Sequence, residues 1–258
     1  MYKKKSLGQN FLKSPAYLQA IVDAAGVQKG DLVLEIGPGE GALTEEILAR
    51  GATVVAVEKD HRLIPMLQVT FDKQIYSKQL ELIEADALEL EAEKLVGKKE
   101  FKLVANIPYY ITGALLKKFL SEETVQPSTL VFLVQKEVAE RIAKSKKESI
   151  LSLSVKVYGE VVYVKTVPRG AFSPAPDVDS AILLVKDVSK KNFQNEKEEQ
   201  RFFTLVRAGF SQKRKKLKNN LTGVFGSETS ARMEAAGIPQ DARAEDVALE
   251  QWLTLTKV

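Results

Sequence analysis

A strand, a glycine-rich turn, a helix and a second strand follow one another between residues 31 and 58, and this unit constrains the fold most. Residues 31–36 and 53–57 are runs of apolar, often β-branched side chains, which is typical of buried strands. Between them, Leu43, Ile47 and Leu48 repeat at helical spacing. Because two successive parallel strands need a crossover helix, the unit predicts an α/β fold.

The turn reads G-P-G-E-G from Gly37 to Gly41, and Glu58 follows 21 residues after Gly37, at the end of the second strand. Glycines such as Gly37 and Gly39 let a ligand approach the backbone closely, and an acid placed like Glu58 can accept hydrogen bonds from ribose hydroxyls. The spacing differs from the G-x-G-x-x-G of dinucleotide sites. It favours an adenosine-type cofactor without phosphate, and the alternative is a tight turn that only needs positive φ.

Further strands are predicted at residues 80–84, 101–105 and 129–134, which are rich in apolar side chains. In a parallel sheet, the loops after these strands open on the same edge as the glycine turn. Asp86 lies in the first of these loops. It either accepts a hydrogen bond from an adenine amino group or serves as a helix cap in solvent.

The second of these loops begins with Asn106-Ile107-Pro108-Tyr109. Pro108 fixes its own φ and has no N–H, and it biases Ile107 toward an extended conformation. The Asn106 amide and the neighbouring carbonyls can then accept hydrogen bonds from an exocyclic amine, while the Tyr109 ring stacks on the base that carries it. The alternative is an ordinary strand-to-loop turn with a core tyrosine.

The strands predicted at residues 161–167 and 180–185 can form an antiparallel pair that closes one edge of the sheet. Residues 150–157 are apolar and fit either a helix, by length, or a strand, by their β-branched side chains. The proline-rich loop at 168–180 has Phe172 at its centre. This phenylalanine either plugs the core or forms a second aromatic face opposite the tyrosine of the preceding motif.

The composition shifts after Lys186 to a polar, charged stretch, and short amphipathic segments follow it up to Trp252 and Leu255. We therefore predict two domains. Residues 1–188 form the cofactor-binding catalytic domain, and residues 189–258 form a small all-α domain that binds nucleic acid.

The net charge is only +4, but the basic residues are bunched in segments without acids. No acid occurs before Asp23 or from Phe202 to Ser227, although the chain has 34 acids. Such segments are typical of a phosphate-backbone footprint, and the alternative is a solvated charged face. The candidate RNA-binding residues are Lys3, Lys4, Lys5, Arg207, Lys213, Arg214, Lys215 and Lys216.

Several classes of protein are excluded by what the chain lacks. With no Cys and a single His, His61, it has neither a Cys/His zinc site nor a cysteine nucleophile, and no G-x-S-x-G elbow supports a serine triad. No metal site is predicted. No apolar run reaches membrane-spanning length and no signal peptide is predicted, so we expect a cytoplasmic protein. The chemistry is expected to come from a cofactor that backbone and amide groups position.

Five segments together closely resemble the ribosomal RNA adenine N6-dimethyltransferases over about residues 5–220. The segments are K-S-L-G-Q-N-F-L at 5–12, E-I-G-P-G-E-G-A-L-T at 35–44, N-I-P-Y-Y at 106–110, G-A-F-S-P-A-P-D-V-D-S at 170–180 and R-A-G-F-S-Q-K-R-K-K-L at 207–217. The full loop from Val167 to Pro174 is more similar to the small-subunit branch than to the large-subunit branch. From about Gly226 onward, no specific resemblance is found.

The resemblance implies a Rossmann-like S-adenosylmethionine-dependent methyltransferase sheet with a small all-α C-terminal domain. The implied reaction transfers methyl groups to N6 of adenosines, two adjacent ones being dimethylated, in a hairpin loop of 16S rRNA. The implied partner is the immature small ribosomal subunit, and the protein is expected to be a monomer. The implied cofactor contacts are Asn10, Leu12, Gly37, Glu58, Asp86 and Asn106. Gly39, which lies in the same glycine turn as Gly37, is added to them. The implied catalytic residues are Asn106, Pro108, Tyr109 and Phe172.

Three other functions compete with this reading: a large-subunit rRNA methyltransferase, a DNA adenine N6-methyltransferase and a non-catalytic ribosome assembly factor. The basic segments do not distinguish RNA from DNA. The intact Asn106, Glu58 and glycine turn argue against a protein that has lost catalysis.

Overall fold

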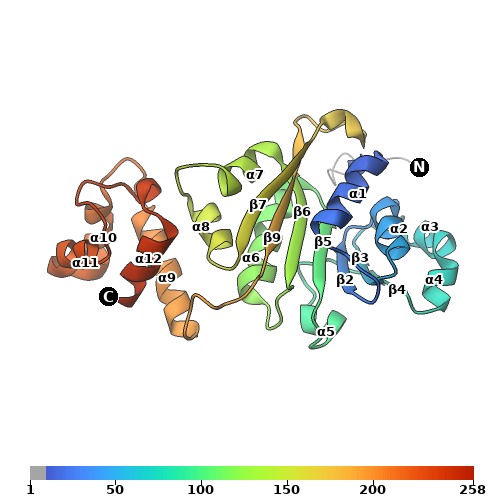
Figure 1. The fold of residues 1–258 in the computed structure, drawn as a ribbon, viewed down its shortest axis with the longest axis horizontal. Helices are drawn as coiled ribbons and strands as arrows, with labels where there is room; N and C mark the ends of the chain where they lie inside the picture. Colours follow the sequence, from blue (N-terminus) through green and yellow to red (C-terminus); the bar gives the residue numbers. More distant parts are fainter. Residues whose placement is uncertain (1–9) are drawn as a thin grey trace. The chain divides into compact units, whose positions relative to one another are not determined.

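The computed structural model describes residues 10–258, so the basic residues Lys3, Lys4 and Lys5 lie outside the described part of the chain. The chain forms two compact units (Figure 1). The sheet unit comprises the described residues up to Ala139 together with Glu160–Val188. The helical unit comprises Glu140–Gly159 and Ser189–Val258.

Within the described residues, the sheet unit holds a mixed sheet of seven strands in the order β4-β3-β2-β5-β6-β9-β7. The strands from β4 to β6 are parallel to their neighbours, and β9 runs antiparallel to both β6 and β7. The predicted α/β sheet and its antiparallel closing pair are thereby confirmed. The strands are β2 (Leu32–Ile36), β3 (Thr53–Glu58), β4 (Leu80–Glu84), β5 (Lys102–Asn106), β6 (Thr129–Gln135), β7 (Glu160–Val167) and β9 (Ser180–Lys186).

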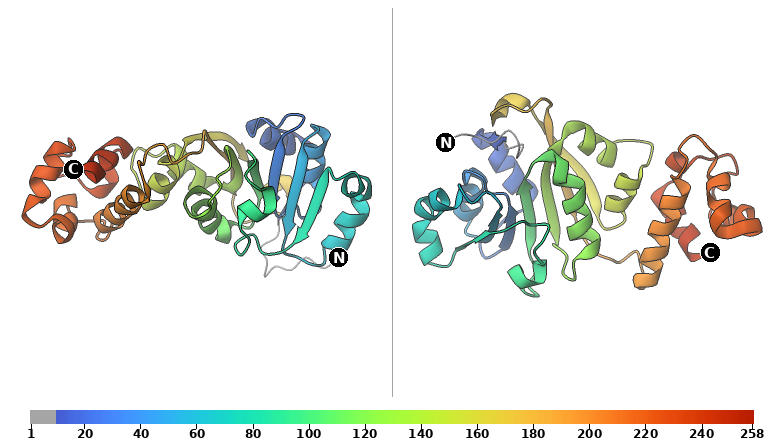
Figure 2. Two further views of the ribbon diagram at one scale, coloured as in Figure 1. Left: turned by 90° about the horizontal axis from the view of Figure 1, so that it is seen from below. Right: turned by 180° about the vertical axis from the view of Figure 1, so that it is seen from behind.

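Helices cover both faces of this sheet, as crossovers between parallel strands require. In Figure 1, α1 lies in front of the strands and α6 behind them, and Figure 2 shows the same arrangement from behind. On the α1 side, Ile21, Ile47, Val54 and Val104 are fully buried in one apolar cluster. The helices are α1 (Pro15–Ala24), α2 (Ala42–Ala49), α3 (Ile64–Thr70), α4 (Asp72–Tyr76), α5 (Ala92–Val96), α6 (Thr112–Lys117), the π-helical turn Lys118–Glu122 and α7 (Lys136–Ala143), which runs from one unit into the other.

The strand order creates a crevice at one edge of the sheet. The chain runs from β2 outward to β3 and β4, and then returns to place β5 on the other side of β2. The loops after β2 and β5 therefore leave in opposite directions, and ligands of open α/β sheets bind at this switch point. The glycine turn and Asn106 follow these two strands.

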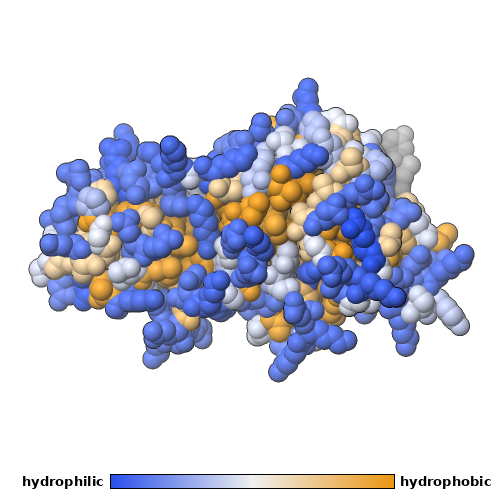
Figure 3. Space-filling view, in the orientation of Figure 1, coloured by the Kyte–Doolittle hydropathy of each residue, from blue (hydrophilic) through white to orange (hydrophobic). Residues whose placement is uncertain are grey.

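Strand β7 is an edge strand, and Figure 3 shows apolar surface where it runs, on a face that is otherwise mostly hydrophilic. Val164 is partly exposed there. The pairing of β7 with β9 shifts register between Tyr163 and Lys165. A bulge and a lysine on an edge strand hinder pairing with another chain. Among the described residues, no helix has the length and apolar character needed to span a membrane.

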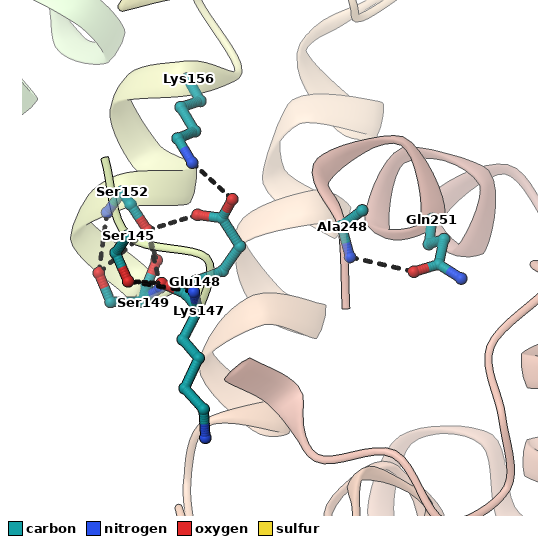
Figure 4. Close-up of polar contacts among 8 residues, drawn as sticks. All are labelled: Ser145, Lys147, Glu148, Ser149, Ser152, Lys156, Ala248 and Gln251. Atoms are coloured by element: carbon teal, nitrogen blue, oxygen red, sulfur yellow. Dashed lines mark hydrogen bonds and ion pairs between the residues drawn. The ribbon is translucent and has the colours of Figure 1, made fainter. Parts of the chain in front are cut away.

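The segment from residue 150 to 157, which fits either helix or strand in sequence, is the helix α8 (Ile150–Lys156). Its N-terminus explains the choice, because Ser149 and Ser152 exchange hydrogen bonds (Figure 4). The Ser152 N–H donates to Ser149 Oγ at 3.0 Å, and the Ser149 N–H donates to Ser152 Oγ at 2.7 Å. Such a capping box satisfies two backbone donors that a helix start otherwise leaves unpaired.

The helical unit is built around aromatic side chains. Phe202 packs edge-on against Phe193 and Phe203, and Phe203 stacks on Tyr158, whose hydroxyl donates to Glu199. These contacts tie residues 140–159 to the C-terminal segment. The helices of this unit besides α8 are α9 (Glu196–Gly209), α10 (Leu217–Phe225), α11 (Thr229–Ala235) and α12 (Leu249–Lys257).

Gly209 and Gly223 form a matched pair for testing how tightly the helical unit is packed. A Cβ on Gly209 would lie 2.4 Å from Cη2 of Trp252 and 2.8 Å from Cδ1 of Leu217, whereas a Cβ on Gly223 meets no atom within 4 Å. Trp252 and Leu217 are fully buried.

We expect Gly209→Ala to lower the free energy of unfolding by about 2 kcal/mol, because overpacking a close-packed core costs roughly that much. Gly223→Ala is expected to raise it by up to about 1 kcal/mol, because alanine is the better helix former. Urea denaturation of both variants measures the difference. If Gly209→Ala proves as stable as Gly223→Ala, the described packing around Trp252 is wrong.

Candidate active site

A cavity lies at the carboxyl ends of β2, β3 and β5, where the switch point predicts a ligand site. Every sequence-predicted cofactor and catalytic residue borders it. The lining includes Asn10, Leu12, Gly37, Gly39, Glu58, Asp86, Asn106, Pro108, Tyr109 and Phe172. The structure thus brings together six chain segments that are far apart in the sequence.

Glu58 fastens the glycine turn to the end of β3. Its side chain is almost fully buried, Oε2 accepts a hydrogen bond from the Gly39 N–H at 3.0 Å, and Oε1 accepts one from the Asp60 N–H at 2.8 Å. Burial raises the pKa of this carboxyl, and the two backbone hydrogen bonds oppose that rise. Each carboxylate oxygen keeps a lone pair, so the residue can hold the turn and still accept from a ribose hydroxyl.

The glycine turn needs glycine for steric reasons as well as for its backbone angles. Gly39 has a φ of +61°, and a Cβ there would lie 2.9 Å from two ring carbons of Phe11. The Phe11 ring therefore covers the turn directly. Sequence reasoning passed over Phe11, although its place between Asn10 and Leu12 could have drawn attention to it.

Phe11 belongs to a short two-stranded sheet that sequence periodicity does not reveal. Strand β1 (Phe11–Leu12) pairs antiparallel with β8 (Phe172–Ser173), and the Lys13 N–H donates to the Ala171 carbonyl at 2.9 Å. Two residues are too few for any periodic signal. This pairing places the N-terminal cofactor segment directly against the proline-rich loop.

Asn106 is the last residue of β5, and it lies beside the glycine turn. Its main-chain oxygen is 3.7 Å from the position that a Cβ on Gly37 would occupy. Asn106 borders the cavity and is only partly buried, and its side chain forms no hydrogen bond with any residue of the 10–258 range. A polar group at a cavity wall without a protein partner is available to a ligand.

Pro108 and Tyr109 continue this wall. Pro108 has φ −57° and ψ 136°, which directs the chain into the 3₁₀ turn Tyr109–Ile111. The Tyr109 hydroxyl and Ser180 Oγ are 2.6 Å apart, and this hydrogen bond fixes the ring. Burial raises the pKa of the Tyr109 phenol, so the hydroxyl stays protonated.

Phe172 lies in the core and also at the cavity wall. It is 6% exposed, belongs to the apolar cluster of the sheet unit and borders the cavity. Its role as an aromatic face opposite Tyr109 stays a prediction. Within the described residues, the rings of Phe172 and Tyr109 make no contact with each other. Both residues therefore line the cavity without packing on each other.

Asp86 already has protein partners, and the sequence did not indicate its ion pair with a lysine. Lys59 forms an ion pair with Oδ2, and the Leu88 N–H donates to Oδ1 at 2.9 Å. Partial burial acts to raise the pKa of Asp86, but these two hydrogen bonds bring it below the usual value. The carboxylate is therefore charged and retains lone pairs for an amino group at the cavity edge.

Glu35 is a buried acid below the turn that the sequence analysis did not single out. It is completely buried on β2, where it pairs with Ala56 and Val104, and neither carboxyl oxygen has a hydrogen-bond partner. Burial raises its pKa to about 8, the Thr44 hydroxyl opposes this without forming a regular hydrogen bond, and the charge of Glu58 adds to it. Glu35 is therefore mostly neutral at pH 7.

The candidate RNA-binding residues of the helical unit lie together at one turn. Lys213, Arg214, Lys215 and Lys216 are in the exposed turn between α9 and α10, and Arg207 is exposed near the end of α9. In the described part of the chain, none of these five forms an ion pair. Across residues 10–258, no three His, Cys, Asp or Glu side chains are grouped so that they could hold a metal ion.

Comparison with known families gives a match over the whole chain. A family model described as ribosomal RNA adenine dimethylase matches residues 1–258. It includes the segment after Gly226, for which the sequence motifs alone gave no resemblance.

Individual relatives match almost as completely. A protein of Dehalococcoides mccartyi named ribosomal RNA small subunit methyltransferase A is 42% identical over 98% of this chain and 87% of its own length. One of the same name from Fusobacterium nucleatum is 37% identical over 99% of this chain and 97% of its own length.

Solved structures of similar proteins show the same fold. The 23S rRNA methyltransferase ErmE superposes with a TM-score of 0.79 at 28% identity, covering 96% of this chain and 98% of its own. A dimethyladenosine transferase from Plasmodium falciparum gives a TM-score of 0.77 at 27% identity and covers 95% of both chains.

Glu35→Gln tests the neutral state of the buried acid. Its pKa is about 8 in the folded protein against an ordinary value of 4.5, so above pH 4.5 the folded state holds a proton that the unfolded state has released. This proton contributes to the free energy of unfolding, and its contribution is fully present below pH 4.5. The contribution is lost as pH rises from 4.5 toward 8, at up to about 1.4 kcal/mol per pH unit.

We expect Glu35→Gln to remove this part of the slope of unfolding free energy against pH, measured by urea denaturation at pH 5.5, 7.0 and 8.5. The matched control is Glu81→Gln on the exposed side of β4, which should keep the wild-type slope. The readout is the slope, so a lower overall stability of Glu35→Gln does not affect it. An unchanged slope in Glu35→Gln would mean that the carboxyl is ionised in the fold.

Proposed function

This chain belongs to the ribosomal RNA adenine dimethylase family and is an S-adenosylmethionine-dependent rRNA adenine dimethyltransferase, and we propose that its targets are two adjacent adenosines in a hairpin loop of small-subunit (16S) rRNA. The observation that carries the proposal is the place of Asn106, which borders the cavity beside the glycine turn and whose side-chain amide has no hydrogen-bond partner among residues 10–258. The small-subunit assignment is supported by the names of the relatives that are 37–42% identical over nearly the whole chain.

The cavity fits the adenosine and methionine parts of the cofactor. At Gly37, the first glycine of the turn, no side chain projects from the backbone at the cavity wall, and a ligand can therefore approach this backbone closely. Glu58 and Asp86 are the acceptors for ribose hydroxyls and for the adenine amino group, and Asn10, Leu12, Gly37 and Gly39 complete the wall. When bound, S-adenosylmethionine supplies a methyl group that its positively charged sulfur makes electrophilic.

The task of the protein is to make the adenine amine a better nucleophile. The nitrogen lone pair of that amine is delocalised into the ring. We propose that Asn106 Oδ1 and a carbonyl at Ile107–Pro108 accept its two N–H groups, which draws the nitrogen toward a tetrahedral shape. Pro108 holds this carbonyl in place, and no strong base is required because positioning and fixed dipoles supply the stabilisation.

Aromatic side chains hold the target base in this proposal. Tyr109, fixed by Ser180, and Phe172, fixed by its pairing with Leu12, flank the space in which the adenine is gripped. A base that leaves its stack or comes from a loop regains stacking energy there.

The helical unit is proposed to bind the rRNA backbone. Its exposed, unpaired cations at Arg207 and Lys213–Lys216 can each replace a counterion of a phosphate. Lys3, Lys4 and Lys5, outside the described residues, are proposed to add to this contact. We further propose that residues 1–188 and 189–258 act as catalytic and RNA-binding domains of a cytoplasmic monomer that works on the immature small subunit without a metal ion.

Asn106→Ala is expected to reduce methyl transfer by at least about a hundredfold, the cost of losing one fixed hydrogen-bonding group at a reacting centre. Transfer is measured with labelled S-adenosylmethionine and undermodified small subunits, with large subunits and DNA as competing substrates. Binding of RNA and of cofactor should change much less. Near-normal turnover in the variant would refute the role of Asn106, and methylation of DNA or large subunits instead would refute the proposed substrate.

In another variant, glutamine replaces Lys213, Arg214, Lys215 and Lys216. It should bind small subunits more weakly. The slope of log K for binding against log salt concentration should become less steep by about 1 for each phosphate contact that is lost. The matched control replaces the four exposed lysines Lys73, Lys94, Lys98 and Lys99 of the sheet unit. Binding is titrated between low and moderate salt. An unchanged slope in the helical-unit variant would place the footprint elsewhere.

A further inference from the structure

Tyr110 is an exposed aromatic residue at the edge of the active-site cavity, and the proposed reaction does not use it. Its side chain is 70% exposed, yet it borders the same cavity as Asn106 and Phe172. Tyr76 is also highly exposed, at 92%, but lies on α4 and does not border this cavity. A single exposed apolar side chain needs no explanation; an exposed ring at the entrance of a site for a nucleobase does.

The backbone that carries Tyr110 is fixed, although the ring is not buried. Tyr110 is the middle residue of the 3₁₀ turn Tyr109–Ile111, in which the Ile111 N–H donates to the Pro108 carbonyl at 3.2 Å. Helix α6 begins directly afterward with Thr112, which is buried. The ring is thus presented outward from a rigid base, and little backbone freedom is lost when a ligand packs against it.

A cation lines the same cavity as this ring. Lys59 and Tyr110 both border the cavity. Lys59 is two-thirds exposed and forms an ion pair with Asp86. An aromatic ring and a cation at one entrance match the base and the phosphate of a single nucleotide.

We propose that Tyr110 is a stacking platform for the nucleobase next to the target adenosine in the RNA chain. The inference rests on the proposed function and names a further part of the same site. Once the target base enters the cavity, its neighbour loses one stacking partner, and the Tyr110 ring replaces it. In a substrate with two adjacent adenosines, the second adenine is held at the entrance while the first reacts. Lys59 then faces the phosphate that joins them.

The first test separates substrate positioning from catalysis. For Tyr110→Ala, we expect the KM for undermodified small subunits to rise about tenfold, the loss of one base–aromatic stack, while kcat and the KM for S-adenosylmethionine stay within about twofold. Tyr110→Phe keeps the ring and should behave as wild type. Tyr76→Ala, the matched control, removes an exposed ring away from the cavity and should also behave as wild type.

A second measurement does not depend on methyl transfer. In an RNA hairpin with 2-aminopurine next to an adenosine, stacking on Tyr110 should quench the fluorescence when wild type, Tyr110→Phe or Tyr76→Ala binds, but not when Tyr110→Ala binds. Equal quenching by Tyr110→Ala and wild type, or an unchanged KM for subunits, overturns the proposal. An equal rise in the cofactor KM also overturns it, because Tyr110 would then belong to the cofactor wall. If wild type quenches but methylates no rRNA, the proposed function fails while the stacking platform stands.

Discussion

The hydrogen bond from the Gly39 N–H to the buried carboxylate of Glu58 is the interaction on which the active site depends most. A turn in the left-handed region leaves N–H groups that no helix or strand satisfies, and an unpaired buried donor costs about 1–3 kcal/mol. Glu58 satisfies this donor from the end of the neighbouring strand, and it also holds the Asp60 N–H. The geometry of the cofactor wall is therefore set by the sheet itself.

Two polar side chains of this region, Glu35 and Asn106, both lack hydrogen-bond partners among the described residues, but they differ in their access to the cavity. Glu35 is sealed in the core without partners and stays mostly neutral, so its charge does not reach the cavity. The amide of Asn106, by contrast, borders the cavity without a protein partner and can be satisfied by a ligand. Pro108 and the hydrogen bond between Tyr109 and Ser180 keep the neighbouring wall rigid. Such fixed, unsatisfied groups suit a reaction that depends on positioning rather than on a strong base.

The parallel strands were predictable because their sequences are rich in apolar and β-branched side chains, and the glycine turn with Glu58 pointed to the edge of the sheet at which the cavity lies. The pairing of β1 with β8 was not predictable, because two residues carry no period and their partners are far apart in the chain. The helix α8 was ambiguous by composition, and the capping box at Ser149 decides it. The assignment of residues 140–159 to the helical unit depends on tertiary contacts such as that of Tyr158 with Glu199, which local patterns do not encode.

The pairing of β1 with β8 also joins the two walls that receive different ligands. Leu12, proposed to contact the cofactor, and Phe172, proposed to contact the target base, are neighbours in one ladder. Main-chain hydrogen bonds thus join residues 11–13 to the proline-rich loop at this wall of the cavity. Because one ladder holds both segments, a displacement of either segment would also displace the other.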